Sequence, residues 1–337
     1  MGGGRLMMWD LRVSRCAVLG VIAFALWACS STSNPGGPVG PDMVRTQQSD
    51  LDASPVQTDL PSVPAPQQLQ VKTTDVTLFI RVAGNTDSGN ILIVINGGPG
   101  SASHMMVGLD PLASETLAVV SYDQRGTGRS TAPTNGYALS EYIKDLDAVR
   151  QHFGVQKVHL FGHSWGGLVA LAYAAVHQEN VESVSLLGSL GPTYRGWLAA
   201  QVRFAQKVAK LQAHGFIPKP IPSGLAGLGA IMPAYFSDPR FPIPAELIKA
   251  GRDVAVYKAT WQALGTWDLT NDFGKIATSV LVLWGEDNPF GVEVGKETVS
   301  ALSAAKTEFV VLKKCGHLWQ ECPDPFFTKM KQFVEAH

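Results

Sequence analysis

Residues 158–167 read VHLFGHSWGG and predict a strand that turns directly into a helix. The apolar run 158–161 is typical of a buried strand, and the pattern G-x-S-x-G follows it directly at residues 162–166. A helical pattern then begins at Trp165. Glycines permit a tight turn between strand and helix, which lifts the Ser164 hydroxyl above the edge of the sheet. The stretch therefore predicts a nucleophilic serine at the amino end of a helix.

Similar apolar runs recur on both sides of this stretch, and helical patterns separate most of them. Strands that alternate with helices indicate a mostly parallel sheet, so we expect an α/β fold whose central sheet is flanked by helices. Residues 69–83 predict a hairpin, and the break in rhythm at about 192–275 predicts a helical cap inserted between strands. The predicted strands are 91–95, 117–122, 158–161, 184–187, 280–284 and 309–312, and the clearest helices are 139–153, 165–178, 292–304 and 324–335.

Two further glycine-rich loops directly follow predicted strands, at residues 96–100 (NGGPG) and 123–130 (DQRGTGRS). Open α/β sheets place their ligands at the carboxyl ends of parallel strands. A glycine pair lets the backbone come close to a substrate carbonyl and donate an N–H group to its oxyanion. For Asp123 and Arg125 we expect an ion pair that braces the second loop.

Together these motifs resemble the proline iminopeptidase-type branch of the α/β-hydrolase superfamily, serine peptidases that remove amino-terminal residues. The resemblance covers roughly residues 69–337. The second loop and the serine turn match the family pattern, whereas Asn96 replaces the usual His of the first loop. The resemblance implies an α/β-hydrolase fold in which Gly98 and Trp165 supply the backbone N–H groups of an oxyanion hole.

A catalytic triad in this fold follows the chain order Ser, acid, His. His317 is the first histidine after the last predicted strand and lies in the loop that directly follows it. The loop 285–289 (GEDNP) follows the strand before it, and the family pattern selects Asp287 there, with Glu286 as the alternative. Asp287 would orient the imidazole while His317 takes the proton of Ser164.

Cys315 and Cys322 lie on either side of His317. In an exported protein two such cysteines are normally oxidised together, and a disulfide here would limit the movement of the catalytic base. Free thiols are one alternative. A zinc site is another, although Cys315, His317 and Cys322 offer only three ligands and the metal would consume the base. We expect no metal and no cofactor.

The amino end predicts export. Arginines precede the apolar run 16–28, which is too short to span a membrane but suits a signal peptide over residues 1–28. The run ends in a sequence that resembles the bacterial lipobox, so Cys29 is expected to carry lipid; ordinary secretion and an uncleaved anchor are the alternatives. Residues 29–68 are rich in Pro, Gly and Ser and predict an extended tether. Ser30 favours the outer membrane if the host has one.

The composition limits the function classes. With 27 Lys+Arg against 28 Asp+Glu, the chain lacks the excess positive charge that nucleic-acid binding requires.

The resemblance implies a small peptide or aminoacyl amide as substrate, bound through its ammonium group by carboxylates of the cap. The predicted cap has few acidic residues, which favours the alternative, a carboxylesterase of the same fold. The motifs at the reacting centre keep the aminopeptidase as the leading prediction. A catalytically dead fold used as a surface binding module is the alternative of another class.

Overall fold

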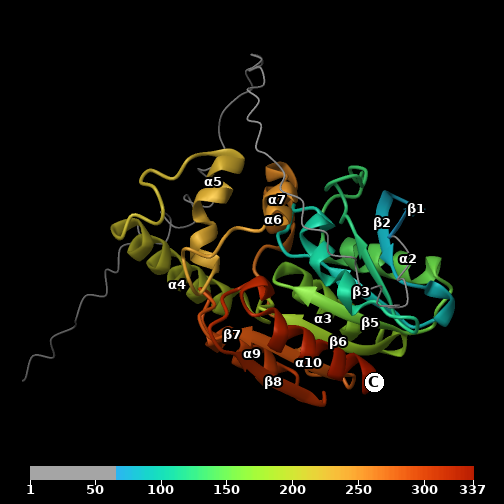
Figure 1. Ribbon diagram of the computed structural model, residues 1–337. Coiled ribbons are helices and arrows are strands. Elements are labelled where there is room, and N and C mark those ends of the chain that lie inside the picture. Colours follow the sequence, from blue (N-terminus) through green and yellow to red (C-terminus); the bar gives the residue numbers. More distant parts are fainter. Residues whose placement is uncertain (1–65) are drawn as a thin grey trace, which may run out of the picture.

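An eight-stranded sheet forms the centre of the computed structural model, which describes residues 66–337 (Figure 1). The strand order is β1-β2-β4-β3-β5-β6-β7-β8. β1 and β2 pair antiparallel, as do β2 and β4, and every other neighbouring pair is parallel. The strands are β1 Gln67–Lys72, β2 Thr77–Ala83, β3 Ile91–Ile95, β4 Ala118–Tyr122, β5 Val158–His163, β6 Val181–Leu187, β7 Ser279–Gly285 and β8 Thr307–Leu312. The expected α/β fold with a mostly parallel sheet is confirmed.

The direction of strand addition reverses between β3 and β5, which are neighbours in the sheet. The connections that leave β3 and β5 run to opposite sides of the sheet. The gap between them forms a crevice at the carboxyl ends of the two strands. The loop after β3 and the serine turn after β5 open into this crevice. The topology therefore brings two of the three sequence motifs together.

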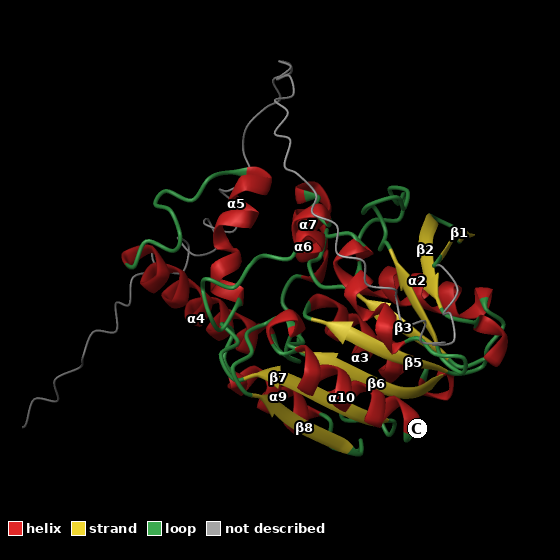
Figure 2. Cartoon of the chain, viewed as in Figure 1, coloured by secondary structure: helices red, strands yellow, loops and turns green. Residues whose placement is uncertain are grey.

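Apolar side chains cover both faces of the sheet, because successive residues of a strand point to opposite faces. Ile91 and Ile93 of β3 pack with α2 and α3, whereas Leu92 and Val94 pack with a 3₁₀ helix and α10 (Figure 2). All five residues of β3 are buried, which explains why the run is continuous rather than alternating. The flanking helices are α2 Leu139–His152, α3 Trp165–Val176, α8 Thr270–Phe273, α9 Val292–Ala301 and α10 Pro323–Glu335, and the 3₁₀ helix is Ser103–Leu112.

The chain between β6 and β7 forms a group of helices that lies beside the sheet (Figure 1). These helices are α4 Tyr194–Ala213, α5 Gly224–Ile231, α6 Ala245–Lys249 and α7 Val254–Leu264. One small apolar core, around Val208 and Leu211, lies within this segment. A second, around Phe236 and Leu247, also includes Leu318 of the loop after β8. We refer to this segment as the cap.

The predicted signal peptide, Cys29 and nearly all of the predicted tether lie outside the described residues. The end of the tether is corrected, because Gln67 and Gln68 already belong to β1. Within residues 66–337 no helix is both long and apolar enough to cross a membrane.

Candidate active site

Ser164 occupies the turn between β5 and α3 in a backbone conformation that non-glycine residues rarely adopt, with φ 53° and ψ −117°. Such conformations cost about 1–3 kcal/mol and persist only where their surroundings enforce them. Here the Ser164 N–H donates to the carbonyl of Leu187 at 3.0 Å, and the Ser164 carbonyl accepts from Gly167 at 3.0 Å. A Cβ atom at Gly166 would lie 2.1 Å from the Ile95 carbonyl oxygen, so the turn requires glycine there.

The loop after β3 is held against this turn by Asn96. Its buried side-chain amide donates to the carbonyls of Gly97 and Ser101, both at 2.8 Å. The Gln124 side chain then links the Asn96 carbonyl to the Trp165 indole, through hydrogen bonds of 2.9 Å each. Asn96 thus gives the loop a fixed shape.

Gly97 and Gly98 leave no room for larger residues beside the nucleophile. A Cβ atom at Gly97 would lie 3.0 Å from the Ser164 Cβ and 2.8 Å from Nδ1 of His163. Gly98 has φ 139° and lines the same cavity as Ser164. Trp165 is the first residue of α3 and is fully buried. The two expected oxyanion-hole residues therefore lie on the two segments that meet at Ser164.

His317 lines that cavity as well, and it is 3% exposed. Its backbone N–H donates to the carbonyl of Tyr235 in the cap at 2.7 Å, and its carbonyl lies 3.1 Å from Nε2 of His163. Cys315 and Cys322 form a disulfide that closes the loop around it. The expected disulfide is present in the structure, and it leaves neither cysteine available for zinc.

The imidazole of His317 has an environment that disfavours a positive charge. Burial lowers its pKa well below the usual value, and the nearby His163 and Lys207 lower it further. Burial also lowers the pKa of His163, to about 4. His317 is therefore neutral, as a general base must be, over a wide range of pH.

Asn288, not Asp287, is the residue that contacts the imidazole. Its Nδ2 atom lies 3.1 Å from Nδ1 of His317, and it is 6% exposed. The Asp287 carboxylate is exposed and accepts a hydrogen bond of 2.6 Å from the Ser237 hydroxyl. The alternative, Glu286, is also exposed. This corrects the expected placement of the triad acid.

The turn after β7 explains the difference. The Asp287 N–H donates to the Cys315 carbonyl and the Asn288 N–H donates to the Gly285 carbonyl, so the turn directs the third residue after the glycine inward. Asp287, the acid expected from the sequence, is the second residue after that glycine, and the turn leaves it exposed. No acid replaces it from β6, because position 188 beside the imidazole is glycine. A Cβ atom there would lie 2.8 Å from Nδ1 of His317.

The cavity above Ser164 is lined mainly by apolar and aromatic side chains of the cap and the sheet loops. In the described part of the chain no Asp or Glu lines it, and Arg252 is the lining residue with a permanent charge. The aromatic residues of the cap that line it are Trp197, Phe204, Tyr235, Tyr257 and Trp261. Phe236 and Trp267 are buried elsewhere, and Phe216 is exposed.

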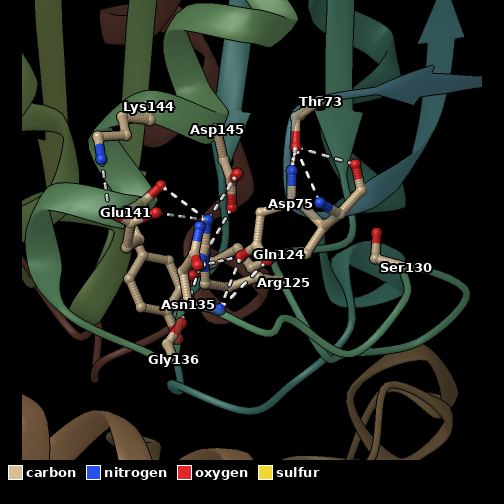
Figure 3. Close-up of polar contacts among 12 residues, drawn as sticks. Thr73, Asp75, Gln124, Arg125, Ser130, Asn135, Gly136, Glu141, Lys144 and Asp145 are labelled. Carbon is tan, nitrogen blue, oxygen red and sulfur yellow. Dashed lines mark hydrogen bonds and ion pairs between the residues drawn. The ribbon is translucent and has the colours of Figure 1, made fainter.

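Arg125 braces the loop after β4, but its partners differ from the expected one (Figure 3). Its guanidinium forms two hydrogen bonds with Asp145 of α2, at 2.8 and 2.9 Å, and an ion pair with Asp75 at 3.1 Å. Asp123 instead accepts hydrogen bonds from the Ser103 and Arg129 backbone N–H groups, at 2.8 Å each. Arg125 therefore connects the loop to α2.

Replacing Arg125 with Met is expected to lower the free energy of unfolding by about 3–5 kcal/mol, because the buried Asp145 carboxylate would lose its cation. Denaturant unfolding followed by circular dichroism measures this change. Lys144→Met is the control, since that side chain is 70% exposed and its ion pair with Glu141 should contribute about 1 kcal/mol or less. Equal effects of the two substitutions would contradict a stabilising role for Arg125.

Comparisons with known proteins agree with this geometry. A family model described as alpha/beta hydrolase fold matches residues 90–215. Over 292 residues the chain is 24% identical to a proline iminopeptidase of Lactobacillus crispatus, an alignment that covers 77% of this chain and 94% of the relative. A proline iminopeptidase of Clostridium botulinum is 33% identical over 128 residues, which are 37% of this chain and 44% of the relative.

Two solved structures show the same fold. The proline iminopeptidase of Mycobacterium smegmatis superposes with a TM-score of 0.64 at 23% identity, over 80% of this chain and 98% of the other. An esterase from Exiguobacterium antarcticum gives 0.62 at 19% identity, over 80% of this chain and 100% of the other. Fold alone therefore does not separate peptidases from esterases.

The chain has the α/β-hydrolase fold, and it is a hydrolase. More particularly, it is a serine hydrolase similar to the proline iminopeptidases.

Proposed function

We propose that this protein cleaves small amides or esters through an acyl-enzyme formed on Ser164. Ser164 attacks the substrate carbonyl while His317 accepts its proton and then passes that proton to the leaving group. The backbone N–H groups of Gly98 and Trp165 stabilise the oxyanion. Water, activated by His317, hydrolyses the acyl-enzyme. The observation that carries the proposal is the strained turn of Ser164, which opens into the same cavity as His317.

Asn288 takes the place of the triad acid in this proposal. An amide can hold the imidazole in position but does not stabilise the imidazolium by charge. Its NH₂ group also favours the tautomer with the ring proton on Nε2, and His317 accepts the Ser164 proton only in the other tautomer. The base is therefore weaker than one paired with a carboxylate. The Asn288 carbonyl oxygen accepts from the Phe290 N–H at 3.1 Å, which turns its NH₂ group toward His317. This orientation follows from the hydrogen-bond network.

The substrate is constrained by two opposing observations. The related proteins are named proline iminopeptidase, and both glycine-rich loops resemble theirs, which supports cleavage next to a free amino terminus. The cavity supports a second candidate, an ester or amide whose acyl part carries no ammonium group. No described carboxylate lines the cavity, and burying an unpaired ammonium group is costly.

Activity on free and N-acetylated aminoacyl arylamides separates the two candidates. From the cavity we expect kcat/KM for the acetylated compounds to equal or exceed that for the free amines. In an aminopeptidase, acetylation would leave a buried carboxylate without its partner and reduce kcat/KM by about 10²-fold or more. A loss of that size would favour the peptidase. Hydrolysis of neither series, nor of short acyl esters, would contradict the proposed function itself.

We further propose that the protein is exported and anchored to a membrane by lipid on Cys29, after removal of residues 1–28. The arginines and apolar run before Cys29 support this proposal. Mass spectrometry of the mature amino terminus tests it, and an unmodified terminus at another residue would contradict it.

A further inference from the structure

The segment before α7 is fastened to the loop that carries Gly98. The Ala102 N–H donates to the Ala250 carbonyl at 3.2 Å, and the Asp253 N–H donates to the Gly100 carbonyl at 2.7 Å. The two backbones are in close contact, because a Cβ atom at Gly100 would lie 2.5 Å from the Asp253 carbonyl oxygen. Arg252 lies between these two anchor points. Its backbone is therefore fixed relative to the loop beside Ser164.

The Arg252 side chain lines the cavity and has unused hydrogen-bonding capacity. Its guanidinium carbon lies 5.0 Å from the centre of the Tyr257 ring, and both residues line the cavity. Nε of Arg252 is buried without a hydrogen-bond partner. Among residues 66–337 Arg252 forms no ion pair, and the neighbouring Asp253 carboxylate instead accepts the Val256 N–H at the start of α7.

A guanidinium group in these surroundings favours an anionic ligand. Arginine presents several N–H donors in a planar fork that matches a carboxylate, and an apolar wall strengthens the attraction because it excludes water. We infer that Arg252 binds a carboxylate group of the substrate. The inference rests on the proposed function and names the substrate class: a small amide or ester that carries a carboxylate besides the bond to be cleaved.

The carboxylate has two possible sources. It can belong to the acyl part, as in the monoester of a dicarboxylic acid, or to the leaving part, as in a dipeptide with a free carboxyl terminus. Both present the same group to Arg252. Matched substrate pairs distinguish them: p-nitrophenyl hydrogen glutarate against p-nitrophenyl valerate for the acyl side, and N-acetyl dipeptides against their carboxamides for the leaving side.

The experiment measures kcat/KM for both pairs with the full chain, the Arg252→Gln variant and the control Arg240→Gln. Arg240 is a cap arginine whose side chain is 76% exposed and which does not line the cavity. The unmodified protein should prefer the carboxylate member of one pair by about 10- to 100-fold, the range of a charge-assisted hydrogen bond. Arg252→Gln should abolish that preference, because it should lower kcat/KM for the carboxylate member more than for the neutral member. Arg240→Gln should change neither.

Failure of this inference is distinct from failure of the proposed function. If the neutral members are hydrolysed but neither carboxylate member is preferred, the role of Arg252 is overturned and the hydrolase proposal stands. That role is also overturned if Arg252→Gln lowers kcat/KM equally for both members of a pair. If no member of either pair is hydrolysed, the proposed substrate class and the role of Arg252 are overturned, and labelling of Ser164 by a phosphonate decides whether the hydrolase proposal stands.

Discussion

Replacing Ser164 with alanine is expected to lower kcat/KM by at least about 10³-fold, because no other group can form the acyl-enzyme. His317→Ala should cause a loss of similar size. The double substitution should lower kcat/KM little further than either single substitution does, because nucleophile and base act as a unit. To compare the variants, kcat/KM of each is measured on an activated ester.

A serine-directed phosphonate provides the second readout. It should label the unmodified protein at Ser164 and should not label Ser164→Ala. Ser189→Ala is the matched control, because Ser189 lines the same cavity and its hydroxyl donates to the Leu190 carbonyl. Labelling that survives in Ser164→Ala, or disappears in Ser189→Ala, would assign the nucleophile to another residue.

Asn288→Asp is expected to raise kcat/KM by about 10- to 10³-fold. The Asn288 NH₂ group faces Nδ1 of His317, which holds the ring proton on Nε2, the atom that has to accept the Ser164 proton. A carboxylate would instead accept a hydrogen bond from Nδ1–H, which leaves Nε2 unprotonated and able to accept the Ser164 proton. The opposite substitution, of Asp by Asn, lowers kcat about 10⁴-fold in the serine protease triad, because it imposes the wrong tautomer.

The pH dependence of kcat/KM gives this substitution a second signature. His317 acts as a base only when neutral, and burial with His163 and Lys207 keeps its pKa well below the usual value. Activity of the unmodified protein should therefore persist to acidic pH. A carboxylate at position 288 would raise the pKa of the imidazole, so the acidic limb of the profile should move to higher pH.

Asp287→Asn is the matched control for the triad position. Its carboxylate accepts from Ser237 at the surface, so we expect kcat/KM and the acidic limb to change little. A large loss in Asp287→Asn, together with no gain in Asn288→Asp, would return the role of triad acid to Asp287.

The sequence predicted the features that depend on local pattern. The buried strand before Ser164, the helix after it and the disulfide around His317 are all confirmed. The contact at His317 was harder to predict, because it depends on how one turn after β7 folds, and a shift of one residue exchanges an exposed carboxylate for a buried amide.

Long-range contacts account for the rest of what the sequence did not predict. The partners of Arg125 lie 50 residues before it and 20 residues after it in the chain, so no local pattern pairs them. Arg252 is one of several cap arginines in the sequence, and only the hydrogen bonds between its segment and the loop at Gly100 place it beside the nucleophile. Such pairings arise from tertiary packing.

The disulfide around His317 also bears on how the protein should be produced and handled. Cys315 and Cys322 join only when the chain reaches an oxidising compartment, and cytosolic thiols would keep them apart. A preparation from bacterial cytoplasm, or an assay buffer that contains dithiothreitol, would therefore contain molecules whose catalytic loop is open. Expression directed to the periplasm, with thiol titration of each batch before kinetic measurements, keeps the specific activities of different preparations comparable.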